Sequence, residues 1–313
     1  MALSTRAEEK KCVTLKPPYF NVHVTLSSGQ TFRWERIGAD IWMGIVRASV
    51  IRVRQAQGIL EVQFESRSDA EKWSVGRIRE YFDLDADYAK RCARLGRHAG
   101  LGAILDFYGG LHILHQEPFE VLISFIISAF NNILRIKECI RKLARAYGDP
   151  IGERGQDFAF SFPSPGALAA ASESELRACG LGYRARYVQE SAARVLEMGE
   201  AFKSLDRLST CELRQELTWF PGVGSKVAEC ILLFGYQRLE AFPIDVWVRR
   251  AMRQLFFHGR PIKDRRISIR ALREFGADAG LAQQYLFTGF RAKRGAFRDV
   301  QRRSLNAASH LRP

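Results

Sequence analysis

The sequence has few cysteines, none of them paired, and this scarcity excludes several classes of site. Its six cysteines are scattered singly, with no Cys-x-x-Cys pair. Such spacing argues against zinc ribbons and against disulfide frameworks, so we expect reduced thiols. No cysteine follows Cys230, and a four-cysteine iron–sulfur loop therefore cannot be built in the rest of the chain. We expect no metal site and no cofactor.

The sequence also lacks a long apolar run. The longest, Val121 to Phe130, falls short of the roughly 18 residues that a membrane-spanning helix needs, so it predicts a buried helix instead. The segment Met1 to Lys11 is polar and charged, with no apolar stretch behind it, which argues against a secretory signal or a membrane anchor. We expect a monomer without a membrane partner that acts inside the cell, in the cytoplasm if bacterial and in the nucleus if eukaryotic.

Acidic residues are the third deficit. The 34 Asp and Glu residues are outnumbered by 48 Lys and Arg residues, which leaves a net charge of +14. A strongly basic protein favours a polyanionic partner, and without a membrane segment nucleic acid is the first candidate. The chain is otherwise 47% hydrophobic over 313 residues, which is typical of an ordered protein with one large or two ordinary domains.

The spacing of apolar residues predicts an α+β fold that is mostly α. Short alternating runs fill the stretch from Phe20 to Glu65 and predict an antiparallel sheet. We place its first strand at the alternating residues Val22, Val24 and Leu26, and its turns at Ser28-Gly29 and Gln57-Gly58.

The pattern becomes helical after Asp69, and from Pro118 onward nearly every segment has helical spacing with Gly, Pro and Ser between segments. A boundary between Tyr108 and Gln116 divides an N-terminal sheet domain with helices, residues 12–115, from a helical domain, residues 116–313.

The segment from Leu217 to Phe234 contains the most informative motif. It predicts a helix, a Pro-Gly-Val-Gly turn and a second helix that starts near Ser225, which together form a helix-hairpin-helix over about residues 213–235. Gly222 and Gly224 let backbone N–H groups approach a phosphate closely, and the start of the second helix favours an anion. The alternative is an ordinary connection between two helices.

Two charged residues follow the turn. Lys226 lies in the first turn of the second helix, where the helix dipole and partial desolvation favour a neutral, nucleophilic amine. Asp245 follows the Phe242-Pro243-Ile244 step and comes directly before a helical run. By itself Asp245 is explained as a helix N-cap.

Five separated blocks together resemble the 8-oxoguanine DNA glycosylase/lyases of the helix-hairpin-helix superfamily, over roughly Phe20 to Lys293. One is the hairpin with its lysine and the later Pro-x-Asp step. The others are the strand signature Ser28 to Trp34, the helix from Phe125 to Ile136, the wedge segment Leu181 to Tyr187, and the helix Ala279 to Phe287.

The resemblance implies base excision repair of double-stranded DNA that contains oxidised guanine. The enzyme would remove 8-oxoguanine, preferably opposite cytosine, after the nucleotide has left the base stack. Lys226 would attack the sugar to form a Schiff base, which also permits cleavage of the abasic strand by β-elimination. Asp245 would stabilise the cationic character that develops.

The resemblance also implies a base pocket. The Gly29 carbonyl would accept a hydrogen bond from N7–H, which 8-oxoguanine has and guanine lacks. Phe287 and Cys230 would sandwich the base, while Gln283 would bind its Watson–Crick edge. Local sequence offers alternatives, namely a hairpin glycine at Gly29 and a buried structural cysteine at Cys230.

The implied DNA contacts come from two other blocks. Tyr183 would wedge into the duplex, while Arg184 and Arg135 would hydrogen-bond the cytosine left without its partner. Asn131 and Asn132 lie in the block that resembles the asparagine-containing helix of the family. Without the resemblance, Tyr183 and Arg184 would be interpreted as a turn aromatic and a surface charge.

Two positions depart from the family. Phe130 stands where an asparagine usually fills the hole left by the base, so we predict a weaker preference for the opposite base. Trp247 stands where some relatives carry a phosphate-contacting histidine, and its indole donates a hydrogen bond without charge.

Two other functions remain as alternatives. A glycosylase of the same fold for another damaged base commonly uses the aspartate with water and lacks the lysine. A non-catalytic helix-hairpin-helix protein would explain the positive charge but leaves Asp245, Gly29 and Gln283 unexplained.

Overall fold

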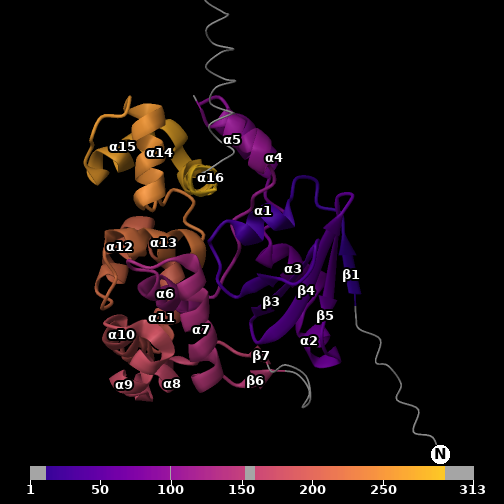
Figure 1. Ribbon diagram of the computed structural model, residues 1–313, viewed down its shortest axis with the longest axis vertical. Helices are drawn as coiled ribbons and strands as arrows, with labels where there is room; N and C mark the ends of the chain where they lie inside the picture. The colour runs from indigo at the N-terminus through magenta and orange to yellow at the C-terminus, as the bar shows by residue number, and fades with distance from the viewer. Residues whose placement is uncertain (1–11, 99, 152–158, 293–313) are drawn as a thin grey trace, which may run out of the picture.

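The computed structural model describes residues 12–98, 100–151 and 159–292, so the segment Met1 to Lys11 and the end of the predicted helical domain lie outside the described residues. The N-terminal part forms a five-stranded antiparallel sheet in the order β1-β5-β4-β3-β2, seen at the right of Figure 1. Its strands are β1 (Cys12–Leu15), β2 (Trp34–Arg36), β3 (Ile41–Val46), β4 (Ser49–Ala56) and β5 (Ile59–Phe64).

The sheet confirms the alternating pattern from β3 to β5. Leu60, Val62 and Phe64 point inward from β5 and are buried. Gln57-Gly58 forms the turn before β5, and both residues have positive φ, 50° and 76°. The sequence pattern does not predict strand β1, because Cys12–Leu15 precedes the alternating stretch that begins at Phe20.

The predicted first strand is wrong, since Val22–Ser27 is the helix α1. The Asn21 side chain caps it by accepting a hydrogen bond from the Val24 N–H at 3.1 Å. Its buried residues are Val22, Thr25 and Leu26, which have helical spacing. The block Ser28 to Trp34 is a loop and not a strand until Trp34, where β2 begins.

The rest of the described chain is helical apart from one small hairpin, and the buried helix predicted near Val121 is present up to Ile127. The helices of the sheet-bearing part are α2 (Arg67–Lys72), α3 (Val75–Tyr81), α4 (Tyr88–Leu95) and α5 (Gly102–Tyr108). They are followed by α6 (Pro118–Ile127), α7 (Ile133–Tyr147), the hairpin β6 (Pro150–Ile151) and β7 (Ala159–Phe160), α8 (Pro165–Ala170), α9 (Glu173–Leu176), η1 (Arg177–Leu181), α10 (Arg184–Met198), α11 (Glu200–Lys203), η2 (Ser204–Arg207), α12 (Thr210–Thr218), α13 (Ser225–Gly235), α14 (Val246–Phe256), α15 (Asp264–Phe275), η3 (Gly276–Asp278) and α16 (Ala279–Arg291).

Two hydrophobic cores hold the molecule together. The smaller one lies between the sheet and helices α1 and α3, with Trp34 and Ile78 at its centre. The larger one joins the C-terminal helices and also takes in α4 and α5, which lie beside α16 in Figure 1. A methyl group at Gly289 would lie 3.0 Å from Ile104, so α16 needs glycine there to approach α5. The domain boundary near Tyr108 to Gln116 remains a prediction.

Within the described part of the chain, every helix is too short or too polar to cross a lipid bilayer.

Candidate active site

The predicted hairpin is present as α12, a turn and α13, two helices that pack against each other. Gly222 has φ +81°, and a methyl group there would lie 2.9 Å from Tyr187, so the turn requires glycine. Gly224 is the N-cap of α13 and offers no side-chain hydrogen bond to the first turn. The N–H groups at the start of α13 are therefore open to an external anion.

Lys226 lies in the first turn of α13, as predicted, and its side chain is partly buried. Its Nζ donates a hydrogen bond of 3.5 Å to Ser128 Oγ at the end of α6. The same atom lies 5.3 Å from the centre of the Phe125 ring, a distance typical of a cation–π contact. The amine is thus held between α13 and α6, away from the solvent-exposed side of the hairpin.

Asp245 is the N-cap of α14 and accepts a hydrogen bond of 2.8 Å from the Val248 N–H. Burial raises the pKa of its carboxyl group above the ordinary value, although the Val248 hydrogen bond and the charge of Lys226 oppose the shift. The positive charge of Lys226 therefore acts on this carboxyl group. The local explanation as an N-cap is correct, and the role of Asp245 as the electrostatic partner of Lys226 stays a prediction.

Cys230 follows Lys226 by one helical turn and is 3% exposed. Burial raises the pKa of its thiol to about 11, although the charge of Lys226 opposes the shift. The group therefore remains a neutral thiol at physiological pH and presents sulfur and no charge to the space beside the amine.

Gln283 and Phe287 lie one turn apart on α16, which places them on the same helical face. Gln283 is 3% exposed and its Oε1 accepts a hydrogen bond of 3.0 Å from the Gln284 side chain. Phe287 is only partly buried, so part of its ring remains accessible.

Gly29 lies just after the end of α1, and at this point the N-terminal part of the chain lies close to Phe287 of α16. Its φ is +81°, and a methyl group there would lie 2.9 Å from Arg291 Nη1, 3.0 Å from Phe287 and 3.1 Å from Ile133. Neither its backbone angle nor its surroundings accept a side chain. Gly29 is thus a helix-ending glycine and not the hairpin glycine that local sequence suggested.

The turn between α6 and α7 carries the departure noted in the sequence. Phe130 has φ +49° and is 99% exposed, so the prediction of a buried helix from Val121 to Phe130 is wrong after Ile127, where α6 ends. Asn131 Nδ2 donates to the Ile127 carbonyl at 3.2 Å, and Asn132 caps α7 by accepting from the Arg135 N–H at 3.0 Å. The Arg135 side chain is exposed on the same surface.

Tyr183 and Arg184 differ in their accessibility. Tyr183 precedes α10 and is 49% exposed, whereas Arg184 is 7% exposed. The Arg184 guanidinium lies 4.5 Å from the Tyr183 ring centre and donates to the carbonyls of Ala129, Phe130 and Leu181. Arg184 is therefore neither the exposed surface charge suggested by local sequence nor, in this conformation, a free donor for a base.

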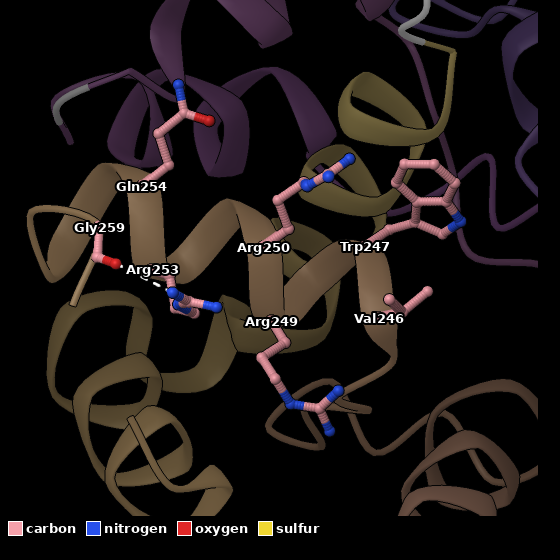
Figure 2. A pocket seen from close by; sticks show the side chains of 7 residues that line it. All are labelled: Val246, Trp247, Arg249, Arg250, Arg253, Gln254 and Gly259. Atoms are coloured by element: carbon pink, nitrogen blue, oxygen red, sulfur yellow. Dashed lines mark hydrogen bonds between the residues drawn. The ribbon is translucent and has the colours of Figure 1, made fainter. Parts of the chain in front are cut away.

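An open cleft runs along α14, lined by Val246, Trp247, Arg249, Arg250, Arg253, Gln254 and Gly259. Figure 2 shows Trp247 and Arg250 on one side of the helix and Arg249 directed to the other. The Arg250 guanidinium lies 5.8 Å from the Trp247 ring centre, while Arg249 pairs with Asp264 at 2.8 Å. Trp247 lacks a charge of its own, but Arg250 supplies one beside it.

Sequence reasoning missed three residues of this site. Ser128 and Phe125 contact the amine of Lys226, and Arg291 lies against Gly29 and Phe287. Arg291 follows Phe287 by four residues, so helical spacing alone places it on the same face. Ser128 and Phe125 carry no comparable local signal, because only the packing of α6 on α13 brings them to Lys226. No group of three metal-ligating side chains occurs among the described residues.

Comparison with protein families matches residues 13–122 to the N-terminal domain of 8-oxoguanine DNA glycosylase and residues 123–276 to the HhH-GPD superfamily of base excision DNA repair proteins. A probable N-glycosylase/DNA lyase of Methanothermobacter thermautotrophicus is 33% identical, over 86% of this chain and 92% of its own length. The N-glycosylase/DNA lyase of Saccharomyces cerevisiae is 32% identical, over 84% of this chain and 81% of its own.

A solved structure agrees with these matches. The Clostridium acetobutylicum 8-oxoguanine glycosylase/lyase, in complex with double-stranded DNA containing cytosine opposite 8-oxoguanine, superposes with a TM-score of 0.83. The two chains are 32% identical, and the alignment covers 91% of this chain and 97% of the other. The chain belongs to the 8-oxoguanine DNA glycosylase family of the HhH-GPD superfamily.

Proposed function

We propose that this protein is a DNA glycosylase and abasic-site lyase that removes 8-oxoguanine opposite cytosine, with Lys226 as the nucleophile. The observation that carries the proposal is the position of the Lys226 amine, which is partly buried against Ser128 and Phe125 and whose charge acts on Asp245 and Cys230. An amine so placed serves as a nucleophile, since lysine at a surface hairpin that only clamps phosphate needs neither burial nor a carboxylate partner.

The chemistry follows from two groups. The Lys226 amine attacks C1′ of the flipped nucleotide through its nitrogen lone pair, and the glycosidic bond breaks as the base leaves with the electron pair and takes up a proton. Opening of the sugar gives a Schiff base, and loss of a C2′ proton then expels the 3′ phosphate. The Asp245 carboxylate stabilises positive charge at C1′ during the first step. These steps need no cofactor.

The base pocket is assigned to Gly29, Cys230, Gln283 and Phe287. Gly29 would accept the N7 proton of the lesion through its carbonyl group, and guanine would present a lone pair there instead. Phe287 and the neutral Cys230 thiol would stack on the two faces of the base, and the Gln283 amide would bind its Watson–Crick edge.

The DNA contacts are assigned to two surfaces. The hairpin glycines Gly222 and Gly224, with Trp247 on the next helix, would hold phosphates of the damaged strand. Around the flipped nucleotide, Tyr183 would wedge into the duplex, and Arg135 would bind the orphan cytosine. Arg184, Asn131 and Asn132 would support this surface, and Arg184 would need to leave its carbonyl partners to reach a base. We expect the enzyme to act as a monomer. Because its substrate is genomic DNA, it would act in the cytoplasm if bacterial and in the nucleus if eukaryotic.

The test is borohydride trapping on a duplex with one 8-oxoguanine opposite cytosine. Reduction of the Schiff base should give a covalent protein–DNA band, with no band for the same duplex carrying guanine. A protein that binds the duplex and excises the lesion without a trapped band would contradict the lysine mechanism, and one that leaves 8-oxoguanine intact would contradict the substrate.

Replacing Asp245 with Asn should lower single-turnover excision by roughly 10²-fold, because the stabilising charge at C1′ is lost. The raised pKa of Asp245 gives a second signature. In the native protein the carboxylate is lost as pH falls through this raised pKa, so excision should decline at a higher pH than an exposed aspartate would dictate.

The decline in excision that the titration of Asp245 causes at low pH should disappear in Asp245→Asn. The measurement is the rate of single-turnover excision as a function of pH. Folding should survive, since Asn also accepts the Val248 N–H hydrogen bond as a helix N-cap. A folded Asp245→Asn protein with the native rate and pH profile would remove Asp245 from the mechanism.

Replacing Phe130 with Asn should strengthen the preference for cytosine opposite the lesion. An exposed phenyl ring fills the hole by stacking but forms no hydrogen bond with the orphan base, whereas an amide does, with an expected gain of roughly 2- to 10-fold in selectivity. The measurement is the ratio of excision rates opposite cytosine and opposite adenine. Leu134→Asn is the matched control, because Leu134 is also exposed, at 82%. An unchanged ratio in Phe130→Asn would contradict this assignment.

A further inference from the structure

Arg291 is a charged residue that lies against two residues of the proposed base pocket and has no role assigned in it. It is the last residue of α16, and its guanidinium lies 4.9 Å from the centre of the Phe287 ring. Its Nη1 would lie 2.9 Å from a methyl group at Gly29. The cation therefore touches both the glycine and the aromatic ring to which the pocket is assigned.

Within the described ranges of the chain, the guanidinium has a single hydrogen-bond acceptor. Nη2 donates a hydrogen bond of 2.6 Å to the Ser27 carbonyl. Among the residues that the structure describes, no other acceptor takes a hydrogen bond from this side chain, although an arginine has five N–H donors. Nη1, the atom beside Gly29, thus has donors available for a ligand.

The electrostatic setting supports a role in binding. Burial lowers the pKa of the Arg291 guanidinium, although Asp245 and Tyr108 oppose the shift. The group remains a cation, because the ordinary pKa of arginine lies far above physiological pH. An arginine that is partly desolvated and lacks a hydrogen-bonded carboxylate gains from a new acceptor.

The chemistry of the lesion provides that acceptor at the correct place. 8-Oxoguanine differs from guanine at two adjacent positions, an added proton on N7 and an added oxygen on C8. A base whose N7–H is bound at the Gly29 carbonyl also has its C8 oxygen near Gly29, and Nη1 of Arg291 lies near the same residue, 2.9 Å from where a methyl group would stand. The N–H donors of a guanidinium point outward in its own plane. When a base stacks on the Phe287 ring, these donors would therefore meet the edge of the base.

We propose that Arg291 is a specificity-determining residue that donates a hydrogen bond to the C8 oxygen of the flipped 8-oxoguanine. The inference rests on the proposed function and deepens it. The Gly29 carbonyl would accept a hydrogen bond from N7–H, and the Arg291 guanidinium would donate one to the C8 oxygen. Guanine offers a lone pair and a C–H bond at the same two positions, so both protein groups would lose their partners.

The test must separate a contact with the C8 oxygen from support of the Gly29 loop through Ser27. Two uncleavable bases opposite cytosine make this distinction. One is 2′-fluoro-8-oxoguanosine, which has both N7–H and the C8 oxygen. The other is 2′-deoxy-9-deazaguanosine, which has N7–H but only hydrogen at C8. Dissociation constants for both duplexes, and for one with 2′-fluoroguanosine, are measured for the native protein and for Arg291→Met.

Arg291→Met should weaken binding of the 8-oxoguanine duplex by about 10-fold or more and leave the 9-deazaguanine duplex within about 2-fold. Arg291→Lys should recover part of the loss, since lysine also donates from a cation. Arg273→Met is the matched control for charge, because Arg273 is exposed on α15. It should affect all duplexes equally.

Equal weakening of the 8-oxoguanine and 9-deazaguanine duplexes by Arg291→Met would overturn the proposal and give Arg291 a structural role. No weakening of either would overturn it as well. Failure of the proposed function is distinct, because the native protein itself would then bind 8-oxoguanine no better than guanine.

Discussion

Lys226→Gln should yield no trapped protein–DNA band, and excision of 8-oxoguanine should fall by roughly 10³-fold or more. Glutamine has a similar length and keeps a hydrogen-bond donor for Ser128, but its amide nitrogen is not a nucleophile and cannot form a Schiff base. DNA affinity should persist, because the hairpin binds through the backbone of the turn and the start of α13. The measurements are borohydride trapping and single-turnover excision, with a binding titration on the same duplex.

The chain offers a matched control at Lys137. This lysine is also partly buried, and burial lowers the pKa of its amine. Its Nζ donates to the Trp34 carbonyl in the sheet, and Asp245 is not among the groups that shift the pKa of this amine. Lys137→Gln should retain the trapped band. A trapped band of native intensity from Lys226→Gln would show that Lys226 is not the nucleophile. Loss of the band from Lys137→Gln alone would show the same.

Gly29→Ala should abolish recognition of the lesion while preserving lyase chemistry. The new methyl group would lie 2.9 Å from Arg291 Nη1 and 3.0 Å from Phe287, on a backbone with φ +81°. Both the contacts and the backbone angle force the loop to move. Displacement of the Gly29 carbonyl by about 1 Å from the position that recognises the base costs roughly 10²-fold in rate. Excision of 8-oxoguanine should fall by that factor. Cleavage of a preformed abasic site, which has no base to accommodate, should change by less than about 3-fold.

Gly58→Ala separates the two causes. Gly58 also has a positive φ, +76°, but a methyl group there would meet nothing within 4 Å. It therefore carries the backbone strain without crowding the pocket, and it should lose some thermal stability and no excision. Equal loss of excision and of abasic-site cleavage in Gly29→Ala would show that the substitution damages the whole catalytic site and not base recognition.

The parts of the site that could be predicted from sequence are those in which one segment supplies both the motif and its geometry. The hairpin fixes the position of Lys226 in the first turn of α13, and the Pro-x-Asp step fixes Asp245 at the start of α14. Helical spacing places Phe287 one turn after Gln283. The alternating burial of β3 to β5 was predicted for the same reason, since strand periodicity is a local property.

The parts that could not be predicted depend on packing between distant segments. Val22, Val24 and Leu26 alternate like a strand, and only the Asn21 cap and the burial of Thr25 favour a helix there. Arg184 was expected at the DNA surface, yet the carbonyls that surround it belong to the turn at Ala129 and Phe130. A sequence motif identifies a charged side chain but does not say which backbone groups will surround it.

The hydrogen bonds from Arg184 to the turn before α7 have a consequence for the entropy of DNA binding. Phe130 adopts a left-handed backbone conformation that costs an ordinary residue about 1 kcal/mol or more. Arg184 stabilises that conformation in the free protein by donating to the carbonyls on either side of it. The turn that carries the exposed Phe130 is therefore ordered before DNA binds, and it has less conformational entropy left to lose on binding.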